Sequence, residues 1–423
     1  MKIAKPQLFL THKSFVLTIL FFTFLLFVRL GLIYSDYQEF TTKPFYFTYT
    51  NVISIEDKPK AKYPYKLLKL QSDDGLEFYT KSYEPMPIET KRVRVEIFPD
   101  SNITFFRFLG AFFVDSKLKE IVPVENSFKD NIIENIKNQH KDNITSSIYP
   151  AIFFNTPLSK DIRDKVIVLG ASHLIALSGF NLSILWGVVF GVLAIIYKPL
   201  QSRFFPHRYS IIDLGLISLL FLGVYVYFTD FSPSLIRAYA MVLFGWMILV
   251  MGLELVSFSF LAFIVSVLLV IYPKFLVSIS FWFSVAGVFY VMLVAYHTKN
   301  INKYLVGFVI MPISMFLLMQ PIVHAIFGQT SPYQLLSIPL ELVYVLFYPV
   351  MMFLHTIGFG GLIDGWLIWL LNFAPSELKD SIFPLYLLIL YVFLSIASIF
   401  NRYLFLILLV LSFGYLVYIF TLI

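Results

Sequence analysis

A stretch near the middle of the chain combines polar side chains with an apolar background. Residues 170–185 read GASHLIALSGFNLSIL and begin a long apolar run. Polar groups at membrane depth are costly unless they face protein or water, so they usually line a pathway or a packed helix interface. We therefore take this segment as the first candidate site and favour a wet pathway along its polar face. Its polar and glycine positions are Ser172, His173, Ser178, Gly179, Asn181 and Ser183.

His173 and Ser178 are also residue types that serve as base and nucleophile in a serine hydrolase. On a straight helix each residue turns by about 100°, so a spacing of five residues places the two side chains about 140° apart. They would face each other only if the helix breaks. The apolar run at 167–197 is long enough to contain a break or re-entrant turn around Ser178-Gly179. A histidine satisfied at a helix interface is the structural alternative.

Arg237 lies one turn into an apolar segment that starts near Ser232-Pro233-Ser234. A serine N-cap with proline in the first turn is an ordinary helix start. The guanidinium is permanently charged, so in a membrane helix it must pair or face water. An ion pair with Asp230 and a role in holding an anion such as phosphate both stay open. In the second case Ser234 and Arg237 join the polar pathway.

A lysine-rich segment at 58–69 reads KPKAKYPYKLLK. Lysines that neutralise phosphates beside rings that stack on bases are typical of single-strand binding. Exposed lysine-rich loops are also common on β domains, and residues 35–166 carry 19 basic and 19 acidic side chains, so this region has no net charge. The DNA contacts that this segment predicts are Lys58, Lys60, Lys62, Tyr63, Tyr65, Lys66 and Lys69.

Other chemistry finds little support in the sequence. The absence of cysteine excludes disulfides, thiolate metal sites and a cysteine nucleophile. There is no Gly-x-x-x-x-Gly-Lys-Ser/Thr loop for ATP and no His-Glu-x-x-His cluster for a metal. We expect no catalytic residue, no cofactor and no metal. Scattered acidic and histidine side chains could serve a proton relay, although a loop position for Glu254 and internal pairing for the rest are simpler expectations. The rest are Glu341, Asp364, His324 and His355.

The composition is that of a polytopic α-helical membrane protein. Of 423 residues, 58% are hydrophobic and 14% charged, and the mean hydropathy is +0.79. A basic tail and an apolar stretch within residues 1–34 predict an uncleaved anchor, because the stretch is long for a signal peptide and no small-residue cleavage site follows. With the anchor, the apolar stretches predict about eleven transmembrane helices. The others lie at 167–197, 210–228, 234–252, 255–272, 275–296, 304–327, 334–355, 357–371, 383–399 and 403–423.

Residues 35–124 alternate between apolar and polar side chains and predict a β-rich domain, for which a small five-stranded barrel is a good fit. Asp73-Asp74-Gly75 separates two strand-like runs, and Val93, Val95 and Ile97 share one face of a third. Residues 103–114 are too short to span a membrane, so they predict an amphipathic surface segment or a buried last strand.

Residues 125–166 then predict an amphipathic helical linker before a multi-pass domain at 167–423. Basic residues in short loops set the orientation of such a domain. With a cytoplasmic N-terminus, nine of these residues lie inside and two, Lys274 and Lys379, lie outside. The β domain is then on the outer face of the membrane. The inside residues are Lys2, Lys5, Lys13, Lys198, Arg203, Arg208, Lys299, Lys303 and Arg402.

Several segments together resemble the ComEC family of competence proteins. GASHLIALSGFNL is similar to the family signature H-L-L-A-I-S-G-L-H, and SPSLIRAYAM at 232–241 is similar to its S-x-x-R-A-x-x-M helix start. YPKFLVSISFWFSVAGV at 272–288 and LLSIPLELV at 335–343 resemble two further family segments. Asn181 stands where the signature has its second histidine, which weakens a role for two histidines acting together.

The resemblance implies an inner-membrane channel that passes single-stranded DNA into the cytoplasm during natural transformation. It implies an OB-fold for the β domain, and as partners single-stranded DNA, membrane lipid, DNA-uptake proteins on the outer face and a cytoplasmic helicase or motor. The sequence ends without the metallo-β-lactamase-like domain of many members, so we expect no nuclease activity here and a possible separate nuclease. An intramembrane hydrolase or glycan polymerase acting on a lipid-linked substrate is the alternative.

Overall fold

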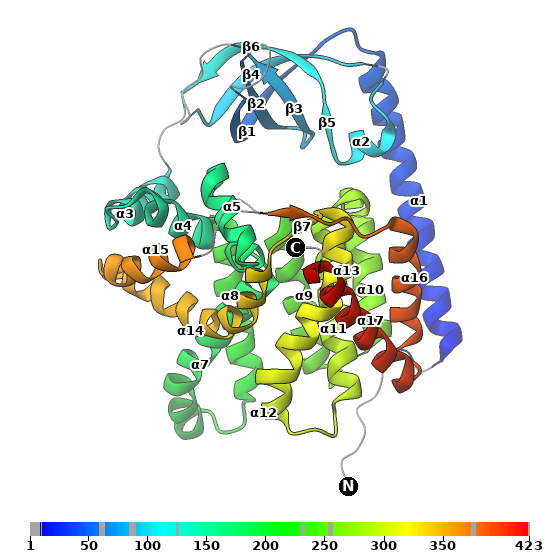
Figure 1. The fold of residues 1–423 in the computed structure, drawn as a ribbon, viewed down its shortest axis with the longest axis vertical. Coiled ribbons are helices and arrows are strands. Elements are labelled where there is room, and N and C mark those ends of the chain that lie inside the picture. The colour runs from blue at the N-terminus through cyan, green and yellow to red at the C-terminus, as the bar shows by residue number, and fades with distance from the viewer. Residues whose placement is uncertain are drawn as a thin grey trace. The chain divides into compact units, whose positions relative to one another are not determined.

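The fold is that of a computed structural model, which describes residue 9 and residues 11–58, 64–83, 90–100, 102–123, 127–229, 233–252, 257–373 and 378–421. The chain divides into two compact units, whose elements are labelled in Figure 1. The sheet unit comprises Thr11–Phe128 and Ala262–Phe281, and the membrane unit comprises Met1–Leu10, Lys129–Leu261 and Trp282–Ile423.

The sheet unit starts with a long apolar helix, α1 (His12–Thr42). The hydroxyl of Thr11 caps its first turn by accepting a hydrogen bond from the Ser14 amide at 3.2 Å. The helix ends at Thr42 rather than at residue 34, so the predicted boundary of the β domain at residue 35 is wrong by about two helical turns. The polar side chains of its last turns had hidden this extension.

Six strands follow in the hydrogen-bonded order β5-β3-β2-β1-β4-β6. β1 pairs antiparallel with β2 and β4, β3 pairs parallel with β5, and β4 pairs antiparallel with β6. Only Val114 separates β5 from β6, so one nearly continuous stretch of chain pairs with both β3 and β4. The strands are β1 (Tyr46–Lys58), β2 (Tyr65–Ser72), β3 (Glu77–Ser82), β4 (Arg92–Phe98), β5 (Ala111–Phe113) and β6 (Asp115–Val122).

The sheet encloses an apolar core on its inner face. Val93, Val95 and Ile97 of β4 are fully buried, which confirms the alternation predicted for them. The predicted turn at Asp73-Asp74-Gly75 is also confirmed, because Gly75 has φ +80° between β2 and β3.

Aromatic rings complete this core. Phe40 of α1 contacts Phe108 and Phe112, whose ring centroids lie 5.4 and 5.6 Å away. Phe108 belongs to the short helix α2 (Phe105–Leu109) and Phe112 to β5. The segment at 103–114 is therefore a helical turn followed by a strand, and it buries Phe108 and Phe112 while Phe106 and Phe113 stay exposed.

The membrane unit is helical (Figure 1). Across the described residues of both units, seven helices are long and apolar enough to cross a membrane, and four apolar helices are shorter. A count of eleven spans stays a prediction. The long ones are α1, α7 (Gly179–Phe204), α8 (Ser210–Phe228), α11 (Ile279–His297), Lys303–Ile326, which ends in α13 (Met311–Ile326), Pro332–Thr356, which contains α14 (Ser337–Thr356), and α17 (Arg402–Thr421). The shorter ones lie in α9 (Pro233–Val250), α10 (Phe258–Ile271), Gly360–Phe373, which contains α15 (Asp364–Phe373), and α16 (Leu385–Ala397).

Residues 129–166, most of the predicted linker, belong to the membrane unit and contribute to its core. The predicted linker contains α3 (Phe128–Asn138), α4 (Asn143–Phe154) and α5 (Lys160–Val168). Ile148 and Tyr149 of α4 and Val166 of α5 are buried in one cluster with Tyr348 of α14. The many polar residues of this stretch lie on the outward side of short helices whose other side is packed.

Candidate functional site

The signature segment starts at a helix end whose left-handed backbone favours glycine. Gly170 has φ +66° just after α5, and the amides of Gly170 and Ala171 donate to Ile167 O and Val166 O at 2.9 and 3.0 Å. This is a Schellman C-cap. A Cβ on Gly170 would meet the Gln334 backbone at 3.0 Å. The signature therefore begins at a fixed turn pressed against the residues that precede α14.

The expected break near Ser178-Gly179 is confirmed. The single-turn helix α6 (Ser172–Ile175) stops at Ala176, whose backbone is extended, and α7 starts at Gly179. Ser178 is the N-cap of α7, because its Oγ accepts a hydrogen bond from the Phe180 amide at 3.3 Å. The predicted segment at 167–197 is thus a helix end, one turn and a long helix.

Asn181 joins the signature to α14. Its side chain is fully buried, and Nδ2 donates to Tyr344 Oη at 3.1 Å and to Leu174 O at 3.4 Å. Ser178 Oγ donates to Asn181 Oδ1 at 3.4 Å. An amide provides both donor and acceptor here, which explains how asparagine replaces a histidine at this position.

His173 and Ser172 lie exposed on α6, whereas Ser178 is partly buried. Within the described residues, the hydroxyl of Ser178 bonds to Phe180 and Asn181 and not to the His173 imidazole. The base–nucleophile pair of a hydrolase is not formed.

Arg237 is brought beside the signature by a close helix contact. A Cβ on Gly179 would meet Ala238 Cβ at 3.4 Å, so the start of α7 packs on α9 one residue from Arg237. Arg237 is 4% exposed. Ser234 lies in the first turn of α9, and its side chain is outside the described part of the chain, as is Asp230, the predicted ion-pair partner.

An apolar cavity of about 70 Å³ lies on the other side of α6. Its lining offers no polar partners for water, so it is a dry cavity and not part of a wet path. The lining comes from α4, α5, α6, α14 and α15 and includes Ile148, Val166, Leu174, Tyr344, Phe347 and Trp366.

In the sheet unit, each lysine of the predicted DNA contacts that the structure describes lies beside a carboxylate. Lys58 Nζ is 2.9 Å from Glu56, Lys66 Nζ is 3.9 Å from Asp57, and Lys69 Nζ is 2.8 Å from Glu77. These carboxylates reduce the positive electrostatic potential that the lysines give to β1 and β2. Tyr65 starts β2, and Lys60, Lys62 and Tyr63 lie outside the described residues.

The outward side of β1 and β4 has a surface that we call the ring–arginine face, formed by Phe47, Tyr49, Arg92 and Arg94. Phe47 and Tyr49 are 46% and 41% exposed. The guanidinium carbon of Arg94 lies 5.8 and 5.7 Å from their ring centroids. That of Arg92 lies 5.5 Å from the Tyr49 ring, and this guanidinium is paired with Asp73 at 2.6 Å. Tyr49 and Arg94 are directly opposite in the β1–β4 ladder.

This face is not among the sites predicted above, although the sequence carries a signal for it. Phe45, Phe47 and Tyr49 recur with a period of two, as do Arg92 and Arg94, which is the pattern of residues on one side of a strand. Their neighbourhood depends on β1 pairing with β4, which are separated along the chain by β2 and β3.

Two of the scattered membrane residues also come together. His355 at the end of α14 and Asp364 at the start of α15 both bind His140, which follows α3. Internal pairing was predicted for His355 and Asp364 and is confirmed, and His324 is likewise bonded to Thr330 Oγ1 at 2.6 Å. His140 was missed because nothing in its local sequence is unusual.

The sequence is also similar to a described protein family and to a curated relative. A family model described as "Competence protein" matches residues 155–422. A relative from Aquifex aeolicus (strain VF5), described as an uncharacterized protein, is 28% identical over 209 residues, which cover 48% of this chain and 46% of the relative. The chain thus spans about half the length of the curated relative it matches. No solved structure matches the chain.

Proposed function

This chain belongs to the competence protein family, and from that premise we propose that it passes single-stranded DNA across the bacterial cytoplasmic membrane during natural transformation. The observation that carries the proposal furthest is the ring–arginine face of the sheet unit. Exposed rings that stack on bases beside cations that contact phosphates are the two components of a single-strand site.

We propose that the sheet unit is an OB-fold. The stretch formed by β5 and β6 pairs with both β3 and β4, and β4 pairs with β1, which supports a closed five-stranded barrel. OB-folds bind single strands on an open face of the barrel. OB-folds use the face of strands 2 and 3 for this, whereas the ring–arginine face lies on the neighbouring strands β1 and β4. We propose that the stacking rings are supplied on this neighbouring surface, and that the lysines at 58–69 are a second, weaker contact.

In the membrane unit we propose that the strand passes the exposed residues of the signature, Ser172 and His173, with Ser178, Gly179 and Asn181 shaping the turn behind them. Ser234 and Arg237, on the helix packed against Gly179, would hold phosphates in the path. Few and spaced cations suit a path in which each phosphate must be held and then released. We further propose that a cytoplasmic motor or helicase pulls the strand.

An intramembrane hydrolase acting on a lipid-linked substrate gains no support from the geometry. Ser178, its nucleophile, is the N-cap of α7 and is engaged with Phe180 and Asn181. We therefore do not put this activity forward as a second function.

The first test is binding of a fluorescent single-stranded oligonucleotide to the full chain in nanodiscs. Loss of a base–ring stack costs about 1–3 kcal/mol, so Phe47→Ala or Tyr49→Ala should weaken binding by roughly 5- to 150-fold. Arg94→Gln should reduce the slope of log K against log salt by about 0.7, because one phosphate contact is lost. Phe106→Ala removes a ring from α2 that is 69% exposed and lies outside the ring–arginine face, and it serves as the control. If all four variants bind the oligonucleotide with equal affinity, this face of the sheet unit is not a DNA-binding site.

The second test is transformation of cells with Phe47→Ala, Tyr49→Ala, Arg94→Gln or Arg237→Ala, each at the wild-type protein level. DNA should reach the outer compartment normally and fail to reach the cytoplasm, and Arg237→Ala should leave oligonucleotide binding by the sheet unit intact. Normal transformation after complete deletion of the chain would overturn the proposal.

A further inference from the structure

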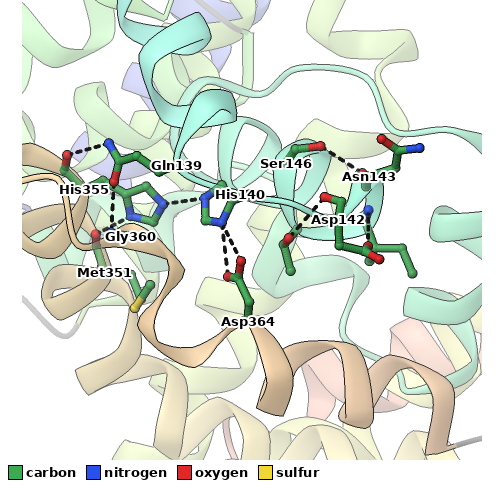
Figure 2. A network of polar contacts seen from close by, with 11 residues as sticks. Gln139, His140, Asp142, Asn143, Ser146, Met351, His355, Gly360 and Asp364 are labelled. Atoms are coloured by element: carbon green, nitrogen blue, oxygen red, sulfur yellow. Dashed lines mark hydrogen bonds and ion pairs between the residues drawn. The ribbon is translucent and has the colours of Figure 1, made fainter.

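Three side chains from separate elements of the membrane unit form a linear network (Figure 2). His140 Nδ1 lies 2.8 Å from Asp364 Oδ2, and His140 Nε2 lies 3.0 Å from His355 Nε2. His355 Nδ1 lies 2.6 Å from the carbonyl oxygen of Met351, one turn earlier on α14. His140 is fully buried and His355 is 6% exposed. The network therefore links the turn after α3 to the ends of α14 and α15.

The hydrogen bonds fix the number of protons in this network. Its three contacts need three hydrogens, because the carboxylate and the carbonyl oxygen can only accept and each bond carries one hydrogen. Two neutral imidazoles bring two. The third is an additional proton, so Asp364, His140 and His355 together have net charge zero. Without this proton one contact would bring two lone pairs together, and with a second one two N–H groups would meet between the rings.

The surroundings hold the two rings in place. Tyr149 of α4 stacks on His140 with ring centroids 4.6 Å apart and lies 4.5 Å from His355. Gln139 Nε2 donates to His355 O at 3.0 Å, and its Oε1 accepts from the Gly360 amide at 2.9 Å. A Cβ on Gly360 would meet the His355 ring at 2.5 Å, so only glycine fits there.

Other titratable groups near the network do not supply its proton. Burial and, second, the charge of Asp364 raise the pKa of Tyr149 far above neutral, so its hydroxyl stays protonated. On the segment of His140, Lys137 and Lys141 are exposed. Asp142 Oδ1 accepts from the Ile144 amide at 2.7 Å and caps α4.

We propose that His140, His355 and Asp364 form a proton-binding site that fastens the turn between α3 and α4 to α14 and α15 only while it holds one proton. When the site opens, these contacts no longer set the number of bound protons, and imidazole is the side chain whose charge changes between about pH 5 and 8. At lower pH the open form binds one proton more than the closed form, and at higher pH one fewer. The closed form is thus favoured in a window around the histidine range and loses ground on both sides, by up to about tenfold per pH unit.

Asp364→Asn changes the shape of this dependence. The asparagine amide can donate to His140 Nδ1, which leaves the ring with a hydrogen on Nε2 for His355. All three contacts are then made by neutral groups and without an additional proton. The closed form of the variant should lose stability as pH falls but not as pH rises.

The absence of cysteine allows a direct test with the full chain. Ile136 is 6% exposed on α3, one turn before His140, so Ile136→Cys reports on release of this helix end. Asn138→Cys, exposed on the same helix, reports on the intrinsic pH dependence of maleimide labelling. The measured quantity is the ratio of the two labelling rates between about pH 5 and 9.

With the native network the ratio should be lowest in the middle of this range and rise on both sides. Asp364→Asn should abolish the rise at high pH and keep the one at low pH, and Asp161→Asn, which removes an exposed carboxylate from α5, should keep both. If the ratio of labelling rates does not change with pH while the three residues are native, the proposal is wrong. This outcome needs no substitution in the network. A high-pH rise that persists in Asp364→Asn would overturn the proposal as well.

Discussion

Single residues of the signature act mainly through the backbone turns that they allow. Gly170 ends α5 in a left-handed conformation, Ser178 caps α7, and Asn181 holds the two to α14. His173, in contrast, is exposed between them. The segment is therefore a rigid frame that presents α6, and its polar residues divide into those that build the frame and those that are available to a passing strand.

Replacing Gly170 should test this division at the residue scale. Gly170→Ala forces a Cβ into the left-handed region, which costs roughly 1–2 kcal/mol, and sets it against the Gln334 backbone at 3.0 Å. We expect a lower midpoint of thermal unfolding in detergent. Gly187→Ala is the control, because nothing lies within 4 Å of that position inside α7 and alanine favours the helix. An equal midpoint for the two variants would contradict the frame.

At the scale of elements, small residues set how closely the membrane helices approach. An ideal Cβ on Gly215 of α8 would lie 1.9 Å from Nε1 of Trp246 on α9, so the indole occupies the space that a side chain would need. Gly223, two turns along the same helix, faces the hydroxyl of Tyr239 at 3.1 Å. α8 therefore places α9, and with it Arg237, by contacts at two glycines.

Gly215→Ala should displace the indole and weaken the α8–α9 contact by about 1–3 kcal/mol, as expected for overpacking. Gly223→Ala should be close to neutral, since a tyrosine hydroxyl can shift by a few tenths of an ångström. Thermal unfolding and the emission maximum of the tryptophans would report the difference. If Gly223→Ala were the more harmful of the two, the assignment of Trp246 as the spacer would be wrong.

On the scale of the whole molecule, each unit has its own core and its own candidate surface. The sheet unit packs aromatic rings of α1, α2, β3 and β5 under its strands. The membrane unit has one core around α4, α5 and α14 and another around α11, α13, α16 and α17. Binding of a strand and its passage are thus separable properties in the proposal, and variants of one unit should spare the other.

The orientation of the chain belongs to the same scale. Basic residues in short loops predict the sheet unit outside and the turn between α7 and α8 inside. In the cysteine-free chain, Asn51→Cys on β1 should react with a membrane-impermeant maleimide in intact spheroplasts, and His207→Cys only after permeabilisation; both positions are exposed. The reverse pattern would place the sheet unit in the cytoplasm and rule out its role in receiving DNA.

The sequence alone determined the class of protein, the position of nearly every apolar helix, the strand alternation around Val93 and the break beside Ser178. These features depend on composition and on periods of a few residues, which a single segment carries by itself. The sequence predicted too early an end for α1, and it predicted a linker at 125–166. In both places, polar residues on one side of a helix obscured the side that is packed.

Only the tertiary structure decided which distant residues meet. Asn181 binds Tyr344, 163 positions away, and His140 meets His355 and Asp364 at separations of 215 and 224. Likewise, Phe47 and Tyr49 lie beside Arg92 and Arg94 only because β1 pairs with β4. Such contacts depend on how whole elements pack together, so they cannot be predicted from the spacing of residues along one segment.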